Sequence, residues 1–148
     1  MSKKNDDVPE ILPGLADIYA MAYRTIDHLP ERFQEHAKKL IVRVENFADT
    51  ETLNGLGVED KYDLLGLYRG VPLPFKHHSE TLSLPDIVFL YRCPLIRFAQ
   101  DNGQEIQTLV THVMIHEIGH HFGYSDFDME WVEKMGKESK EDGGRNRD

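Results

Sequence analysis

The sequence has a single cysteine and no long apolar run, and these two absences exclude several classes of protein. Cys93 cannot form a disulfide within the chain, so nothing points to an oxidising compartment, and we expect a packed thiol rather than a nucleophile. No segment approaches the ~18 apolar residues of a membrane-spanning helix. The first residues, MSKKNDDVPE, lack the apolar stretch of a secretory signal, so we expect a cytoplasmic protein.

Positive charge is scarce as well. The 17 lysines and arginines are outnumbered by 26 aspartates and glutamates, which gives a formal net charge of -9. A protein that binds nucleic acid or an anionic membrane needs a basic surface that neutralises phosphates. We therefore expect neither nucleic acid nor membrane as a partner. The sequence has no pattern that predicts an oligomeric state.

The composition is that of one globular domain. The chain has 148 residues, of which 40% are hydrophobic and 29% charged, and this length favours one modest core. Residues 1–10 are expected to be a flexible N-terminus. The charged tail at 137–148 has no apolar anchors and is expected to be disordered. We therefore predict a single domain over residues 11–136.

The periodicity of the apolar residues predicts an α+β fold. Helical spacing occurs in the stretches 15–29 and 31–38, whereas alternating or continuous apolar runs predict strands at 40–47, 64–69 and 86–92. A small sheet of three to four strands should pack on the N-terminal helix and on a longer helix further along the chain.

Two stretches between the predicted strands are expected to be loops. Residues 48–62 are rich in Asp, Thr, Asn and Gly. Residues 71–85, VPLPFKHHSETLSLP, contain three prolines, and loops of this length inside a domain are often functional. After Pro94 we expect a short helical turn over 95–99.

The longest helix is expected over residues 103–122. Asn102 and Glu105 have the spacing of a capping box, and Gly123 can adopt the left-handed conformation that ends a helix. Apolar residues at helical spacing should form its buried stripe, namely Ile106, Leu109, Val110 and Val113. A short helix over 128–135 is expected to follow.

The end of this helix carries two histidines that can bind one metal ion. His116 and His120 are four residues apart, so both imidazoles project from one face about one turn apart. Both rings can therefore reach one zinc ion, whose bonds to histidine nitrogen are about 2.0–2.1 Å long. His112 and His121 are expected on the flanks of the helix rather than on the metal.

Glu117 and Asp126 complete the predicted site. Glu117, next to the first histidine, is at the usual position of the general base, which takes a proton from the attacking water and does not bind the metal. Catalytic zinc takes three protein ligands, and a turn at Gly123 can bring Asp126 to the third position. Glu130 or Glu133, from the following helix, is the alternative third ligand.

Three stretches of the sequence resemble one family. The run HEIGHHFGYSD looks like the zincins, in the metzincin-type form with aspartate as third ligand, as in snapalysin-like peptidases. Together with LLGLYRGVPL and LPDIVFLYRCPLIRF, it is similar to the small bacterial zincin-like metallopeptidase family, long catalogued as a domain of unknown function. The resemblance covers about residues 12–135. It implies a minimal zincin-like fold, with Zn2+ bound by His116, His120 and Asp126 and with Glu117 as base.

The chain departs from full-size metzincins in its last part. Those proteins have a separate methionine turn beneath the metal, whereas Met129 follows Asp126 closely here; Met129 and Met135 are both expected to be core residues. Larger zincins also build the lower wall of the cleft from a long C-terminal subdomain. Only a short segment follows Asp126, so the cleft should be shallow and open.

The predicted activity is metal-assisted hydrolysis of peptide bonds, with a peptide or an unfolded protein as substrate lying along an exposed strand edge. Tyr124 and His78 are candidates for stabilising the oxyanion. His77 and His78 are also candidates for covering the open metal position and holding the enzyme latent. The alternative is a catalytically silent zinc-binding adaptor with a zincin fold. Glu117 argues for the enzyme, because a purely structural zinc site needs no base.

Overall fold

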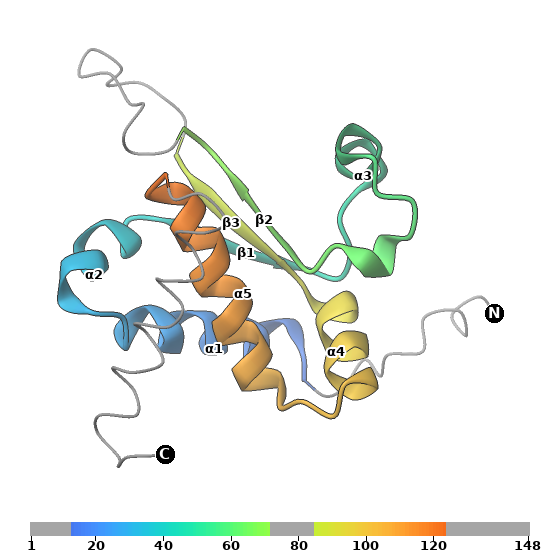
Figure 1. Ribbon diagram of the computed structural model, residues 1–148, viewed down its shortest axis with the longest axis horizontal. Helices are drawn as coiled ribbons and strands as arrows, with labels where there is room; N and C mark the ends of the chain where they lie inside the picture. Colours follow the sequence, from blue (N-terminus) through green and yellow to red (C-terminus); the bar gives the residue numbers. More distant parts are fainter. Residues whose placement is uncertain (1–12, 72–84, 124–148) are drawn as a thin grey trace.

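The computed structural model describes residues 13–71 and 85–123 (Figure 1). The elements follow one another as α1 (Leu15–Asp27), α2 (Glu31–Ala37), β1 (Ile41–Glu45), α3 (Thr50–Leu56), the 3-10 helix η2 (Lys61–Asp63), β2 (Gly66–Arg69), β3 (Ile87–Tyr91), α4 (Arg92–Asp101) and α5 (Ile106–His121). The predicted α+β class is confirmed. The expected N-terminus at 1–10, the helix at 128–135, the tail at 137–148 and most of the loop at 71–85 lie outside the described residues.

The described strands form one mixed sheet in the order β1-β3-β2. β3 runs parallel to β1 and antiparallel to β2, and Val88 pairs with Val42 on one side and with Tyr68 on the other. The sequence Ile-Val-Phe-Leu-Tyr explains the central place of β3, because a strand flanked by two others and covered on both faces is apolar at every position.

The main core lies between this sheet and two helices. α1 and α5 cover one face of the sheet, where Val88 and Leu90 meet buried side chains of both helices (Figure 1). The opposite face holds a smaller cluster in which Phe89 and Tyr91 pack with Ala48. In the part of the chain that the structure describes, no helix is long and apolar enough to cross a membrane.

The prediction of a loop over 48–62 is wrong, because two short helices form there. Asp49 caps α3 by accepting a hydrogen bond from the Thr52 backbone N–H at 2.7 Å, and Asp60 caps η2 through the Tyr62 backbone N–H at 3.0 Å. Gly57, with φ 71°, ends α3 in the left-handed conformation. The polar residues that suggested a loop are thus the caps of helices too short to show a periodic apolar stripe.

The predicted capping box of the longest helix is also wrong. Asn102 is the C-cap of α4, and its side-chain amide donates to the Phe98 carbonyl at 2.8 Å. α5 therefore begins at Ile106 instead of residue 103, with Glu105 as an N-cap that makes no side-chain bond. α4 is also longer than the expected turn, because Pro94 lies in its first turn, where a missing N–H costs nothing.

Candidate metal centre

His116 and His120 lie on one side of α5, as the sequence predicts. Their ring centres are 5.0 Å apart and their planes are inclined by 82°. Zinc bound to each ring nitrogen at 2.0–2.1 Å would lie about 3 Å from each ring centre, and two such rings at a tetrahedral angle have centres about 5 Å apart. Both side chains are partly exposed. The separation of the two rings therefore fits a shared zinc ion that remains accessible to a substrate.

The predicted third ligand lies outside the described residues. Asp126 follows the end of α5, and Gly123, the last described residue, has the positive φ (83°) that a sharp turn requires. Within 13–71 and 85–123, no group of three metal-ligating side chains occurs. Other candidates outside the described residues are the alternative ligands Glu130 and Glu133, the methionines Met129 and Met135, and Tyr124, His77 and His78.

Glu117 is buried beneath the edge of the sheet. Its exposed fraction is 9%, and it accepts a hydrogen bond from the Tyr68 backbone N–H of β2. Burial removes water from the carboxylate and raises the pKa of Glu117 to about 7, although the bond from Tyr68 acts in the opposite direction. In the metal-free protein a buried carboxylate with a raised pKa binds a proton more readily than an exposed one does.

Gly66 allows β2 to approach α5 closely enough for this contact. A Cβ atom at Gly66 would lie 2.7 Å from Val113 Cγ1 and 3.1 Å from the Phe89 backbone oxygen. Real Cβ atoms essentially never show a contact as short as 2.7 Å, so an added methyl group would force the Val113 side chain or the strand to move. The absence of a side chain at Gly66 therefore helps place the Tyr68 N–H at the Glu117 carboxylate.

We expect Gly66→Ala to lower the free energy of unfolding by about 1–3 kcal/mol, because it overpacks this contact. The measurement is urea unfolding followed by circular dichroism. Gly55→Ala is the matched control, since a Cβ there meets nothing within 4 Å and alanine favours the helix in which Gly55 lies. Equal stability of the two variants would contradict the close approach of β2 and α5.

His121 has a structural role that the sequence did not reveal. It is buried, and its Nδ1 lies 3.0 Å from the Tyr68 hydroxyl and 3.7 Å from Asp86 Oδ2. Burial and the charge of Asp86 raise the pKa of Tyr68. Asp86 Oδ1 also accepts from the Val71 N–H at 3.1 Å. These contacts fasten the end of β2 to the last turn of α5, beside His120. His112 is exposed, as expected for a helix flank.

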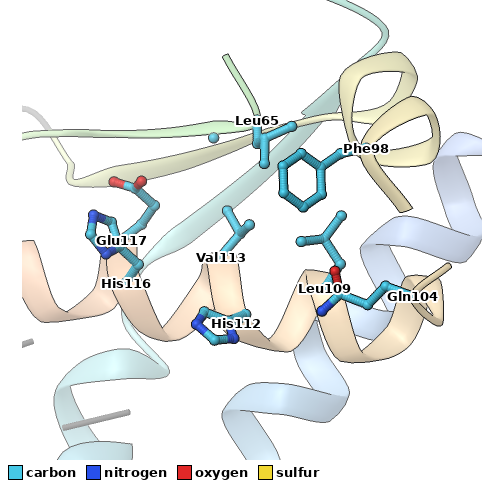
Figure 2. A pocket seen from close by; sticks show the side chains of 9 residues that line it. Leu65, Phe98, Gln104, Leu109, His112, Val113, His116 and Glu117 are labelled. Atoms are coloured by element: carbon cyan, nitrogen blue, oxygen red, sulfur yellow. The ribbon is translucent and has the colours of Figure 1, made fainter. Parts of the chain in front are cut away.

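Glu117 lies in the wall of two hollows. One has a volume of about 440 Å³, and Figure 2 shows Leu65, Phe98 and Val113 converging on it with His116 and Glu117 at one end. The other has a volume of about 500 Å³ and lies between α3 and β2, with Glu117 and His120 in its wall. Each hollow therefore contains one of the two histidines, and the buried carboxylate is common to both.

A comparison with protein families supports the resemblance noted in the sequence. A family model described as zincin-like metallopeptidase matches residues 37–135. The matched stretch includes the whole sheet, α4 and α5, together with the segment that carries Asp126. No curated protein matches the chain.

Proposed function

Because the chain belongs to the zincin-like metallopeptidase family, we propose that it is a zinc-dependent peptidase that cleaves unfolded segments of protein. The observation that carries this proposal is the arrangement on α5. Two histidine rings at a separation suited to one zinc ion flank a buried glutamate that lies in the wall of two hollows. A site that only stabilised the fold would need neither the glutamate nor the hollows.

His116, His120 and Asp126 are the proposed zinc ligands. When bound, zinc supplies a Lewis acid for the peptide carbonyl and lowers the pKa of water. Glu117 accepts a proton at its carboxylate from the attacking water and delivers it to the leaving amine. The Tyr68 N–H holds this carboxylate in place during the transfer.

The outer edge of β2 is the proposed binding place for the peptide backbone. Within the residues that the structure describes, β2 pairs with β3 alone, so its other edge has backbone groups available for an added strand, apart from the Tyr68 N–H, whose hydrogen bond Glu117 accepts. β2 lies against Glu117, since the carboxylate of Glu117 accepts a hydrogen bond from the Tyr68 backbone N–H. A peptide added there would bring one of its amides near the proposed base.

Zinc content and hydrolysis of an unfolded protein test this proposal together. We expect one zinc per chain, loss of hydrolysis in a chelator and its return on adding zinc. Asp126→Ala should bind zinc about 100-fold or more weakly, because two histidines alone are an incomplete site. Glu130→Ala and Glu133→Ala are the controls and should retain zinc. Stoichiometric zinc of unchanged affinity in Asp126→Ala would refute this ligand set.

A further inference from the structure

We propose that the two hollows bind two large apolar side chains of one extended peptide, one on each side of the amide that reacts at Glu117. The inference rests on the proposed function and names its substrate class. That class is an unfolded segment in which apolar residues flank the cleaved bond on both sides. Folded proteins bury such residues, so an unfolded chain is the form that offers them.

The first hollow is lined mainly by apolar side chains, together with Gln104 and His112, and has the metal-site residues at one end. Its apolar wall comes from three parts of the chain, with Leu65 before β2, Phe98 on α4, and Leu109 and Val113 on α5 (Figure 2). Phe98 is 41% exposed, although a phenylalanine is normally covered. An accessible aromatic ring beside His116 is suited to contact with an apolar side chain of a ligand.

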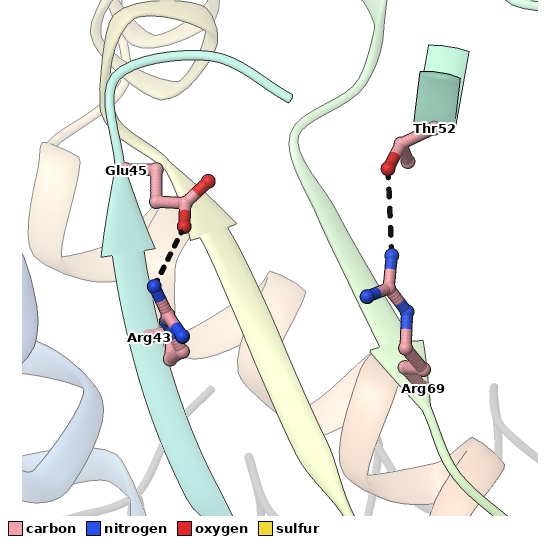
Figure 3. Close-up of polar contacts among 4 residues, drawn as sticks. All are labelled: Arg43, Glu45, Thr52 and Arg69. Carbon is pink, nitrogen blue, oxygen red and sulfur yellow. Dashed lines mark hydrogen bonds and ion pairs between the residues drawn. The ribbon is translucent and has the colours of Figure 1, made fainter. Parts of the chain in front are cut away.

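The second hollow is built by the α3–η2 segment and β2. Leu56 is 50% exposed and contributes to the wall with Val58, Leu64 and Leu67, next to His120 and Glu117. An Arg69–Thr52 hydrogen bond of 3.4 Å connects α3 to β2 (Figure 3). The Asp49 cap and this bond hold α3 where Leu56 can reach a ligand.

The geometry of an extended peptide matches the positions of the two hollows. Successive side chains of a strand point to opposite faces, so the two residues joined by the reacting amide project in opposite directions. On α5 the first hollow is lined by residues from Leu109 to Glu117 and the second by Glu117 and His120, so the two hollows lie on either side of Glu117 along the helix. Both volumes, about 440 and 500 Å³, lie in the usual range of ligand pockets.

The first experiment uses the zinc-loaded protein on a denatured protein of known sequence, with cleavage sites mapped by mass spectrometry. Sites with large apolar residues on both sides of the cleaved bond support the inference. Sites without such a preference on either side overturn it. Phe98→Ser and Leu56→Ser are each expected to remove the preference on one side only. Both side chains are substantially exposed, so neither substitution should unfold the protein. Leu15→Ser is the control, because Leu15 is 42% exposed and lies on α1, which lines neither hollow.

A binding measurement separates this inference from the proposed hydrolysis. Zinc-loaded Glu117→Gln is titrated against a fluorescently labelled, end-blocked peptide Gly-Gly-Leu-Leu-Gly-Gly and the corresponding Ser-Ser peptide, with fluorescence anisotropy as the readout. We expect the Leu-Leu peptide to bind about 10–100-fold more tightly than the Ser-Ser peptide. Adding Phe98→Ser or Leu56→Ser to the Glu117→Gln protein should reduce this preference, whereas adding Leu15→Ser should not. If this preference is found but wild type cleaves no peptide, the result supports the binding of apolar side chains in the two hollows and refutes the proposed hydrolysis. Equal binding of the two peptides, or no binding of either, overturns the inference.

Discussion

Glu117→Gln is expected to lower kcat for peptide hydrolysis by about 100- to 10,000-fold while the protein keeps its zinc. Glutamine retains the shape of the side chain and an oxygen that can accept the Tyr68 N–H, but it cannot accept a proton from water. Zinc binding should be unaffected, because the proposed ligands are His116, His120 and Asp126. The measurement pairs cleavage of an internally quenched peptide with elemental analysis of zinc in the same samples.

Glu105→Gln provides the control for this substitution. It makes the same chemical change on an exposed residue at the start of the same helix, and its activity should equal that of wild type. If neither wild type nor Glu117→Gln cleaves any peptide although both hold zinc, the chain is the silent adaptor. If Glu117→Gln retains full activity, Glu117 is not the general base.

The parts of the structure that follow from local periodicity could be predicted from the sequence. The apolar run of β3, the apolar faces of α1 and α2, and the positive φ of Gly123 agree with expectation. His116 and His120 come together because a four-residue spacing on a helix fixes their relative direction. For these features the sequence neighbours alone determine the geometry.

The features that the sequence did not predict have two causes. Some depend on a residue that can cap either of two helices, and others depend on contacts between residues that are distant in the sequence. Asn102 can cap either of two helices, and the structure uses it to end α4. His121 is buried where it contacts Tyr68 of β2 and Asp86, which precedes β3. Nothing near position 121 in the sequence signals those partners. A search for buried polar partners of a histidine on the inner face of a helix could have suggested them.

The two hollows also could not be predicted from the sequence, because their walls come from helices and strands that are distant from one another in the chain. The first needs Phe98, which belongs to a helix predicted as one turn, and the second needs α3, which was predicted as a loop. The shallow, open cleft expected from the short C-terminal segment concerns residues outside the described part. The sequence thus predicted that His116 and His120 lie together on α5, whereas the walls of the two hollows depend on helices with weak sequence signals.

Metal-free Glu117→Gln should be more stable than metal-free wild type by up to about 3 kcal/mol at pH 8. Burial raises the pKa of Glu117 from 4.5 to about 7, so the folded protein holds this proton more tightly than the unfolded chain does. Each pH unit of difference corresponds to about 1.4 kcal/mol. Above pH 7 the folded wild type therefore contains an ionised buried carboxylate, and burying this charge lowers its free energy of unfolding. Glutamine is uncharged and avoids this loss of stability. Urea unfolding in the presence of a chelator measures the difference.

The pH dependence of this difference identifies its cause. Between pH 4.5 and about 7 the unfolded chain has lost the proton that the folded protein keeps, so the stability of wild type falls as pH rises, and above 7 the loss is complete. Below about pH 4 the carboxyl is protonated in both states, and the advantage of Glu117→Gln should disappear apart from a constant offset. Glu105→Gln, which makes the same chemical change on an exposed residue, is the control at both pH values. An advantage of Glu117→Gln that is the same at both pH values would mean that packing, and not the buried charge, causes it. If the advantage grows with pH as expected, the wild-type protein keeps at this position a carboxylate that weakens its own fold, which is the expected cost of a residue retained for proton transfer.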